Sequence, residues 1–232
     1  RGAEMIKYAS NAFLATKISY INELANLCEK IDVNIQDIST GMGLDQRIGD
    51  RFLRAGPAYG GSCFPKDTRA LIDTANKFKT DLSVVKSVVK SNNNRKISLI
   101  RRIEKILNKK LKNKIITFLG VTFKPNTDDM REAASIPMIN YLNKKSCKIR
   151  YFDPSGEKNE FKKLKNVKYF KDIQSACLKS DLIVIHTEWN EFKLLNFKKL
   201  VKKRNFTIYD LRNIYSPSKM SNSKIKYYSI GR

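Results

Sequence analysis

The hydrophobic pattern of the chain changes near Asn113, and this change predicts two different kinds of folding unit. Before Asn113, apolar residues recur three and four positions apart over residues 3–31 and 82–107, which is the spacing of long, largely buried helices. Shorter helices are expected over residues 35–40, closed by Gly41, and over residues 65–78, with Pro65 as the first helical residue. The first part of the chain is therefore predicted to be all-α.

After Asn113, short apolar runs alternate with helical patterns. The runs predict strands at residues 115–119, 149–152, 182–185 and 206–210, and the helical patterns between them cover residues 136–142 and 173–178. Because consecutive strands joined by helices pair in parallel, we expect an α/β, Rossmann-like parallel-sheet domain. The boundary is placed near residue 110, which gives a helical domain over residues 1–110 and an α/β domain over residues 111–232.

Composition indicates a globular chain. Of its 232 residues, 41% are hydrophobic and 29% charged, which excludes both a disordered and a membrane-embedded class. No apolar run approaches the roughly 20 residues that span a bilayer, and no signal peptide begins the chain, so a soluble, cytoplasmic protein is expected. The four cysteines contain no C-x-x-C pair, so reduced thiols are expected rather than a disulfide framework or a zinc site.

The formal net charge of +24 raises the possibility of a polyanionic partner. The lysine-rich segments at residues 109–112, 162–165 and 198–203 mix lysine with apolar residues at helical spacing, which is typical of solvated helix faces. Aromatic side chains for base stacking are sparse among them. A basic nucleic-acid-binding module is therefore kept as an alternative, and no specific nucleic-acid contact is predicted.

A glycine-cysteine loop carries the strongest chemical signal, with the sequence Gly60-Gly61-Ser62-Cys63-Phe64-Pro65-Lys66-Asp67. The paired glycines allow the backbone to turn sharply and approach a ligand. Cys63 lies next to a predicted helix start, where the free N–H groups stabilise a thiolate, and Lys66 adds a positive neighbour. Asp67 lies one helical turn beyond Cys63, where it would hold or deprotonate a water molecule. The segment predicts a cysteine nucleophile with a neighbouring base.

The loops that follow the predicted strands are the second place to look for function, because open parallel sheets bind ligands beyond the carboxyl ends of their strands. These loops carry Lys124, Arg131, His186 and Arg212. No G-x-G-x-x-G follows any strand, so the phosphate-binding fingerprint of a dinucleotide site is missing from the sequence.

Three segments together resemble the UDP-glucose/GDP-mannose dehydrogenase family. They are the glycine-cysteine loop, Lys7-Tyr8-Ala9-Ser10-Asn11-Ala12-Phe13-Leu14-Ala15-Thr16-Lys17-Ile18-Ser19 and Phe123-Lys124-Pro125-Asn126-Thr127-Asp128-Asp129-Met130-Arg131-Glu132. The likeness runs in the right order from about Ala3 to Tyr215. It implies a central dimerisation domain with the catalytic cysteine, then a UDP-sugar-binding domain. The family's N-terminal NAD-binding Rossmann domain has no counterpart here, so the chain is expected to be a fragment that is inactive alone.

The resemblance implies the NAD-dependent, four-electron oxidation of UDP-glucose to UDP-glucuronate. Cys63 would form the thiohemiacetal and then the thioester, and Asp67 would activate the hydrolytic water. Lys7 would stabilise oxyanion charge, while Asn11 would hydrogen-bond the sugar and the catalytic water. The catalytic set is therefore Cys63, Asp67, Lys7 and Asn11.

The same resemblance implies the binding residues. Lys7, Asn11, Phe52, Leu53, Arg54, Ala55, Gly56, Gly60 and Lys124 would bind the nucleotide sugar, and Lys66 and Arg131 would contact NAD. Arg47 would reach the substrate of a neighbouring subunit in a homodimer formed by the long central helices, and Arg212 would lie near the uridine. Ala58 stands where the family usually has glycine, and His186 is expected to be structural.

Other activities stay open at this stage. GDP-mannose or UDP-N-acetylmannosamine would be oxidised by the same chemistry, although Phe64 and the segment around Arg47 favour UDP-glucose. A regulatory protein that keeps the fold without activity is a further alternative, which the intact catalytic set argues against. No metal and no membrane contact are predicted.

Overall fold

The computed structural model describes residues 2–223 and 225–232. It divides into two compact units. One unit holds the chain up to Lys96 together with Ile230–Arg232, and the other holds Ile97–Ser229. The division falls inside the second long helix, whereas the boundary predicted near residue 110 lies just after that helix ends.

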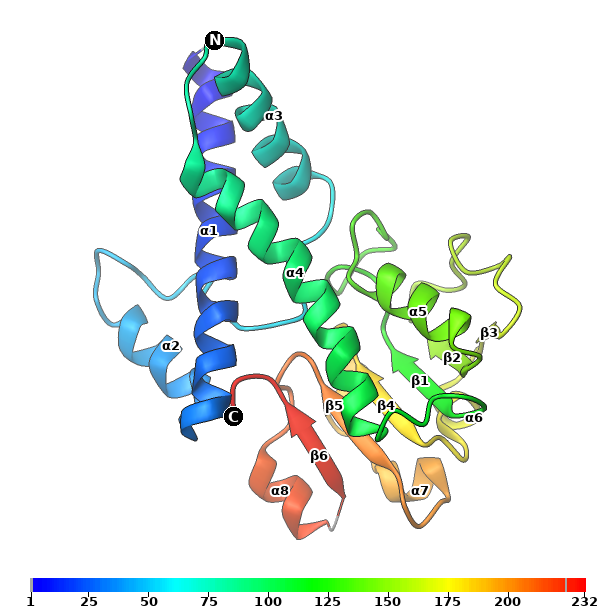
Figure 1. Cartoon of the computed structure of the whole chain (residues 1–232). Helices are drawn as coiled ribbons and strands as arrows, with labels where there is room; N and C mark the ends of the chain where they lie inside the picture. Colours follow the sequence, from blue (N-terminus) through cyan, green and yellow to red (C-terminus); the bar gives the residue numbers. More distant parts are fainter. Residues whose placement is uncertain (1, 224) are drawn as a thin grey trace. The chain divides into compact units, whose positions relative to one another are not determined.

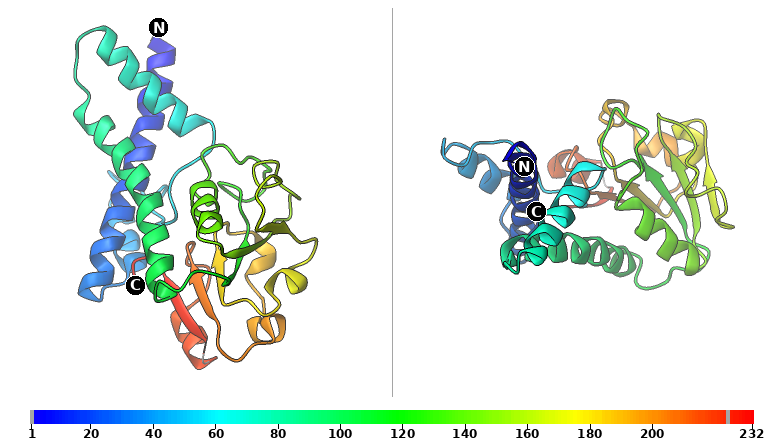
Figure 2. Two further views of the ribbon diagram at one scale, coloured as in Figure 1. Left: turned by 45° about the vertical axis from the view of Figure 1, so that its right-hand side comes forward. Right: turned by 90° about the horizontal axis from the view of Figure 1, so that it is seen from above.

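The first unit is built from helices. They are α1 (Gly2–Ile31), α2 (Ile35–Gly43), α3 (Cys63–Lys77) and the first part of α4 (Ser83–Ile106). Figure 2 shows α3 and the start of α4 lying along α1. Ala15, Tyr59 and Val88 form a buried apolar cluster in this unit, and Ile18 and Phe64 pack against it. Because the small Ala15 faces α4 and the loop before α3, these segments can approach α1 closely.

Two helix boundaries differ from the sequence predictions. Helix α3 begins at Cys63 rather than at Pro65. Proline is tolerated anywhere in the first helical turn, because none of the N–H groups there has a partner within the helix, so it does not fix the first residue. Helix α2 continues through Gly41 to Gly43. A glycine is therefore a weak stop signal when the residues after it can still form helical hydrogen bonds.

The second unit is an α/β domain whose six strands are all paired in parallel, in the order β3-β2-β1-β4-β5-β6. A helical region followed by an α/β domain with a parallel sheet is confirmed. The strands are β1 (Ile115–Leu119), β2 (Lys148–Phe152), β3 (Val167–Tyr169), β4 (Leu182–Ile185), β5 (Thr207–Asp210) and β6 (Lys226–Ser229). The strand order reverses between β1 and β4, which is where such sheets bind ligands.

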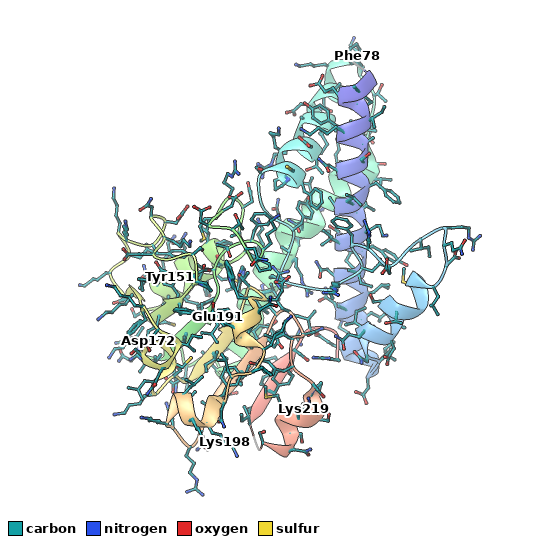
Figure 3. The ribbon with its side chains drawn as sticks, turned by 180° about the vertical axis from the view of Figure 1, so that it is seen from behind. Phe78, Tyr151, Asp172, Glu191, Lys198 and Lys219 are labelled. Carbon is teal, nitrogen blue, oxygen red and sulfur yellow. The ribbon has the colours of Figure 1, made fainter. Side chains whose placement is uncertain are left out.

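The helices of this unit cover both faces of the sheet. They are α5 (Ser135–Lys144), α6 (Ile173–Cys177), α7 (Phe197–Val201) and α8 (Pro217–Asn222), with a short 3-10 turn at Asn190–Phe192. Ile183 and Ile185 of β4 pack into one buried cluster with residues of α6, α7 and α8. Figure 1 shows α5 on the near face, and Figure 3, from behind, shows the helix that carries Lys198 on the opposite face. Burial on both faces explains the continuous apolar sequence of β4.

The tripeptide Ile230–Arg232 returns to the helical unit after β6. The N–H of Gly231 donates to Glu29 Oε1 at 2.7 Å, and its carbonyl accepts from the N–H of Ile35 at 2.8 Å. Gly231 has a φ of +69°, and a Cβ built there would lie 2.6 Å from the Ile35 side chain and 2.9 Å from Ala25 Cβ. Only glycine fits this backbone conformation and this space.

None of the helices in the described part of the chain combines the length and the apolar character that crossing a membrane requires.

Candidate functional site

Cys63 lies at the start of α3, where the helix begins directly after Ser62. Of the four cysteines, all within the described residues, Cys63 alone is exposed. Its Sγ lies 3.7 Å from Ser62 Oγ, and Ser62 makes no capping hydrogen bond to the helix. The first N–H groups of α3 have no partner within the helix, so the positive end of the helix lies beside the sulfur. An exposed cysteine in this position is suited to act as a nucleophile.

Asp67 lies one turn further along α3 and is fully buried. Its Oδ2 accepts a 2.6 Å hydrogen bond from Nδ2 of Asn11 on α1. Its Oδ1 accepts no hydrogen bond, and the Nζ of Lys66 lies 3.5 Å from it. A buried carboxylate oxygen without a hydrogen-bond donor requires an explanation, and a bound water molecule would supply one. Asn11 and Asp67, the two residues predicted to contact the catalytic water, are thus hydrogen-bonded to each other.

The lysines of this site are both exposed. Lys66 Nζ approaches Asp67, but 66% of the lysine side chain remains accessible. Lys7 lies four residues before Asn11 on α1 and is exposed, so the two residues share one helix face. Lys7 is therefore placed beside Asn11, as the helical spacing predicts, with its charge open to solvent.

The predicted sugar-binding loop divides into buried and exposed residues. Leu53, Ala55 and Gly56 are buried, whereas Phe52 and Arg54 are exposed. Gly60 is half-buried, and Ala58 is not among the residues with positive φ. Because alanine adopts the conformation found at position 58 freely, its departure from the family's usual glycine does not strain this turn.

The backbone of the same loop is held by side chains that sequence reasoning did not single out. Asn22, on α1, accepts the N–H of Gly56, and Arg95, on α4, donates to the carbonyl of Gly56. Asn92, also on α4, bonds both backbone groups of Tyr59. Asn22 is one of several polar residues in the sequence of α1, and Asn92 and Arg95 belong to the polar run Asn92-Asn93-Asn94-Arg95, which matches no motif of known chemistry.

In the α/β unit, the loop after β1 passes close to the loop after β4. Gly120 has a φ of +73°, and a Cβ there would lie 2.5 Å from Thr187 Cβ. Thr187 Oγ1 in turn donates to the carbonyl of Thr122 at 2.6 Å. Lys124 follows at the exposed end of this loop, with its Nζ 5.5 Å from the Phe123 ring. Lys124 is therefore exposed in a loop that the contacts of Gly120 and Thr122 with Thr187 hold beside the carboxyl end of β4.

Arg212, in the loop after β5, contacts the loops after β1 and β4 at the carboxyl ends of the strands. It donates from Nε to the carbonyl of His186 and from Nη2 to the carbonyl of Phe123, both at 2.8 Å. It also forms a 3.0 Å ion pair with Glu188, and its side chain is 17% exposed. Arg212 was expected near the uridine. In this structure its guanidinium holds the loops after β1 and β4 in place.

His186 is buried, and its Nδ1 lies 3.1 Å from Thr187 Oγ1. Burial, together with the positive charge of Arg212, lowers the pKa of His186 to about 3. The imidazole is therefore neutral at physiological pH, and its Nε2 has no hydrogen-bond partner.

The remaining predicted contacts are exposed cations with local partners. Arg131 pairs with Asp129 at 2.8 Å and Arg47 with Asp45 at 2.6 Å. The Arg131 side chain is 68% exposed and that of Arg47 is 88% exposed. Each arginine thus lies at the surface of its own unit, and exposed ion pairs of this kind exchange partners at low energetic cost.

Comparison with known proteins extends over nearly the whole chain. Residues 1–94 match the central domain of the UDP-glucose/GDP-mannose dehydrogenase family, and residues 117–217 match the UDP-binding domain of the same family. The UDP-glucose 6-dehydrogenase of Rickettsia typhi is 47% identical over 99% of this chain, and that of Rhizobium meliloti is 44% identical over 100%.

The same relationship holds for a solved structure. A UDP-glucose dehydrogenase from Pyrobaculum islandicum is similar to this chain with a TM-score of 0.85 and 32% identity, over 98% of this chain and 50% of that one. The chain likewise covers 54% of the Rickettsia protein and 53% of the Rhizobium protein, about half of each. The two matched domains account for the order of a helical unit and an α/β unit along the sequence: the chain belongs to the UDP-glucose/GDP-mannose dehydrogenase family.

Proposed function

We propose that this chain provides the catalytic cysteine and the UDP-sugar-binding domain of an NAD-dependent UDP-glucose 6-dehydrogenase. The reaction is the four-electron oxidation of carbon 6 of UDP-glucose, which converts the alcohol to the carboxylate of UDP-glucuronate. The chain spans about half the length of its curated relatives, so we propose a part of the reaction for it and not the complete reaction.

The observation that supports this proposal most strongly is the arrangement of Cys63, Asp67 and Asn11. The exposed thiol lies at a helix N-terminus, and one turn away a buried carboxylate keeps one oxygen without a hydrogen bond. A cysteine nucleophile followed by a water-activating base is what oxidation through a thioester requires.

The chemistry of these residues follows from their positions. The Cys63 thiolate adds to the aldehyde carbon and forms a C–S bond, while the charge of Lys7 stabilises the oxyanion. Once that carbon has been oxidised to the thioester, water adds to it and gives one proton to the Asp67 carboxylate. The C–S bond then breaks, and Cys63 leaves as the thiolate. Asn11, bonded to Asp67 at 2.6 Å, orients the carboxylate toward this water.

Each unit contains residues proposed to bind the nucleotide sugar. Lys124 would neutralise the diphosphate. Phe52 and Arg54, the exposed members of the predicted loop, would contact the sugar directly, whereas the buried Leu53, Ala55 and Gly56 would shape the loop. Gly60 would let the backbone approach the ligand.

The oxidising power would come from bound NAD, whose chemistry is hydride acceptance. Lys66 and Arg131 fit a role at its phosphates, because both are exposed cations, with 66% and 68% of their side chains accessible. The sequence contains no dinucleotide glycine fingerprint, so these residues would hold the cofactor only in part.

We also propose that residues 1–110 act as an all-α dimerisation domain, with α1 as the contact. Ile6, Phe13, Tyr20 and Leu27 recur every seven residues along α1 and are 51–69% exposed. A stripe of large apolar side chains at this spacing is typical of a helix that packs against a second helix. The partner is a second copy of the chain. In that dimer the exposed Arg47 would reach the neighbouring subunit's substrate.

Alkylation of Cys63 by iodoacetamide provides a direct test. UDP-glucose is expected to slow the reaction in a saturable manner, while Cys63→Ser abolishes it. Burial raises the pKa of Cys147 to about 11 and that of Cys177 to about 12, so these thiols stay unreactive near neutral pH. Calorimetry that detects no UDP or UDP-glucose binding would contradict the proposal. Stronger protection by GDP-mannose or UDP-N-acetylmannosamine would reassign the substrate.

A further inference from the structure

We propose that Asn22, Asn92 and Arg95 are positioning residues that hold the loop before Cys63 in its sugar-binding conformation. This inference rests on the proposed function, because it assigns those residues a role in recognising the sugar. All three side chains belong to the helical unit and are no more than 5% exposed.

The first attachment point is Gly56. Its N–H donates to Asn22 Oδ1 at 2.8 Å, and its carbonyl accepts from Nε and Nη2 of Arg95 at 3.2 and 3.1 Å. Arg95 Nη1 also donates to the carbonyl of Asn22 at 3.4 Å and to Asn26 Oδ1 at 2.5 Å. Both backbone groups of Gly56 are therefore fixed to α1 and α4, and neither is available to a ligand.

The second attachment point is Tyr59. Asn92 accepts the N–H of Tyr59 at 2.9 Å and donates to its carbonyl at 3.1 Å. A single buried amide thus pairs with both backbone groups of one loop residue. Such a pair fixes both the position and the orientation of the peptide, because each bond constrains the other.

These two points control the residues around the nucleophile. The Tyr59 ring contacts the Phe64 ring edge-on with centroids 6.1 Å apart, and the Phe52 ring lies 6.0 Å from Phe64. Phe64 immediately follows Cys63. A displacement at Gly56 or Tyr59 would therefore move exposed Phe52 and Arg54 on one side and the start of α3 on the other.

A purely structural role and a positioning role predict different measurements. If the three side chains only stabilise the fold, their loss lowers the unfolding temperature and leaves the affinity of the folded protein unchanged. If they position the loop, the folded variant loses affinity for the glucose part of the ligand but still binds UDP normally, because Lys124 lies in the other unit. The ratio of the UDP and UDP-glucose dissociation constants distinguishes these roles.

The matched pair Asn22→Leu and Asn22→Asp provides the test, since both side chains approach asparagine in shape. Aspartate keeps the oxygen that accepts the Gly56 N–H, and Arg95 neutralises its charge, whereas leucine removes the acceptor. Calorimetry well below the unfolding temperature is expected to show that N22L binds UDP-glucose about tenfold more weakly and UDP within about twofold of wild type. N22D is expected to match wild type for both ligands.

Equal UDP-glucose affinity in folded N22L and wild type would overturn the proposal, as would an N22D variant that is as impaired as N22L. If N22L does not fold, Asn22→Ser replaces it, because its short hydroxyl cannot reach Gly56 and the smaller side chain introduces no clash. The same shift in affinity ratio is expected for N22S, and its absence would equally overturn the proposal.

Amide hydrogen exchange without ligand separates failure of this proposal from failure of the proposed function. N22L is expected to accelerate exchange at Gly56 far more than at Tyr59, and Asn92→Leu to do the reverse. Wild-type protein that binds neither UDP nor UDP-glucose would refute the proposed function and, with it, the recognition role of the loop. If wild-type protein binds UDP-glucose but N22L and Asn92→Leu leave exchange at both amides unchanged, only the proposed positioning role is refuted.

Discussion

Asn11 donates a 2.6 Å hydrogen bond to the fully buried carboxylate of Asp67, so helix α1 holds the base that helix α3 carries. The other carboxylate oxygen has no hydrogen-bond donor. The fold thus keeps a partly satisfied charge in its interior, where a charge is costly unless its hydrogen bonds are complete.

Replacing Asp67 with Asn is therefore expected to preserve stability while abolishing thioester hydrolysis. The amide oxygen can still accept from Asn11, and the buried charge disappears, so the free energy of unfolding should stay equal or rise by about 1 kcal/mol. Urea unfolding measures this change. Asp73→Asn removes an exposed charge from the same helix and should change stability by less than about 0.5 kcal/mol. A D67N variant that is clearly less stable than wild type would contradict this view of the site.

The buried His186 predicts a specific dependence of stability on pH. Its folded-state pKa of about 3 lies below the ordinary value of 6.5, so between these values the unfolded chain binds a proton that the folded chain does not. The free energy of unfolding therefore has its full value above about pH 6.5 and falls below that pH by about 1.4 kcal/mol per unit. His186→Asn should lack this pH dependence. Urea unfolding of both proteins at several pH values from 7 to 4.5 measures it, and an equal loss of stability in both would refute it.

Gly231→Ala is expected to destabilise the protein through both backbone strain and collision. Gly49 has the same φ of +69°, but a Cβ there would meet nothing within 4 Å, so Gly49→Ala isolates the strain, about 1–2 kcal/mol. At Gly231 the contact with Ile35 should add about 1–3 kcal/mol. Chemical unfolding of both variants measures the difference, and equal losses would show that the packing around Gly231 adapts.

Phe13→Glu is expected to convert the proposed dimer to a monomer, because the phenylalanine is 66% exposed at the centre of the apolar stripe on α1. A charge there would be buried without a partner in the dimer. Phe78 is 75% exposed at the end of α3, so Phe78→Glu serves as the control and should leave the dimer intact. Sedimentation velocity at micromolar concentration distinguishes these states. A wild-type monomer would rule out the α1 contact.

Lys124→Ala is expected to weaken binding of UDP and of UDP-glucose equally, by about ten- to a hundredfold, the cost of losing a charged contact to phosphate. Lys145→Ala removes the same charge from an exposed position at the end of α5 and should have little effect. Calorimetry at two salt concentrations should also show a weaker salt dependence for K124A than for K145A. Equal behaviour of the two variants would remove Lys124 from the site.

Segments with a clear apolar pattern could be predicted from the sequence, whether the pattern is a continuous run, as in strand β4, or a helical repeat, as in α4. Strand β4 and helix α4 begin and end within one residue of the predicted bounds. Strands β3 and β6 were missed: each lies at an edge of the sheet, and their sequences, Val-Lys-Tyr and Lys-Tyr-Tyr-Ser, contain no buried apolar run. Edge strands are exposed on one side and have weak sequence patterns.

The candidate site shows the same limit. Cys63 and Asp67 were identifiable because a helical turn relates them locally. The bonds of Asn22 and Arg95 to Gly56 join residues 34 and 39 positions away in the sequence, and no local pattern encodes such contacts. The proposed role of Arg212 at the uridine came from a motif, which could not reveal that its guanidinium bonds the Phe123 carbonyl 89 residues earlier.

The return of Gly231 to α1 and α2 also sets an order on biosynthesis. The ribosome completes Glu29 and Ile35 long before it reaches the residue that bonds both of them. Domains generally fold in the order in which they emerge, but the helical unit here can acquire its last hydrogen bonds only after the entire α/β unit has been translated. These hydrogen bonds can therefore form only after residues 230–232 have left the ribosome, when the segment that carries the nucleophile has long been exposed.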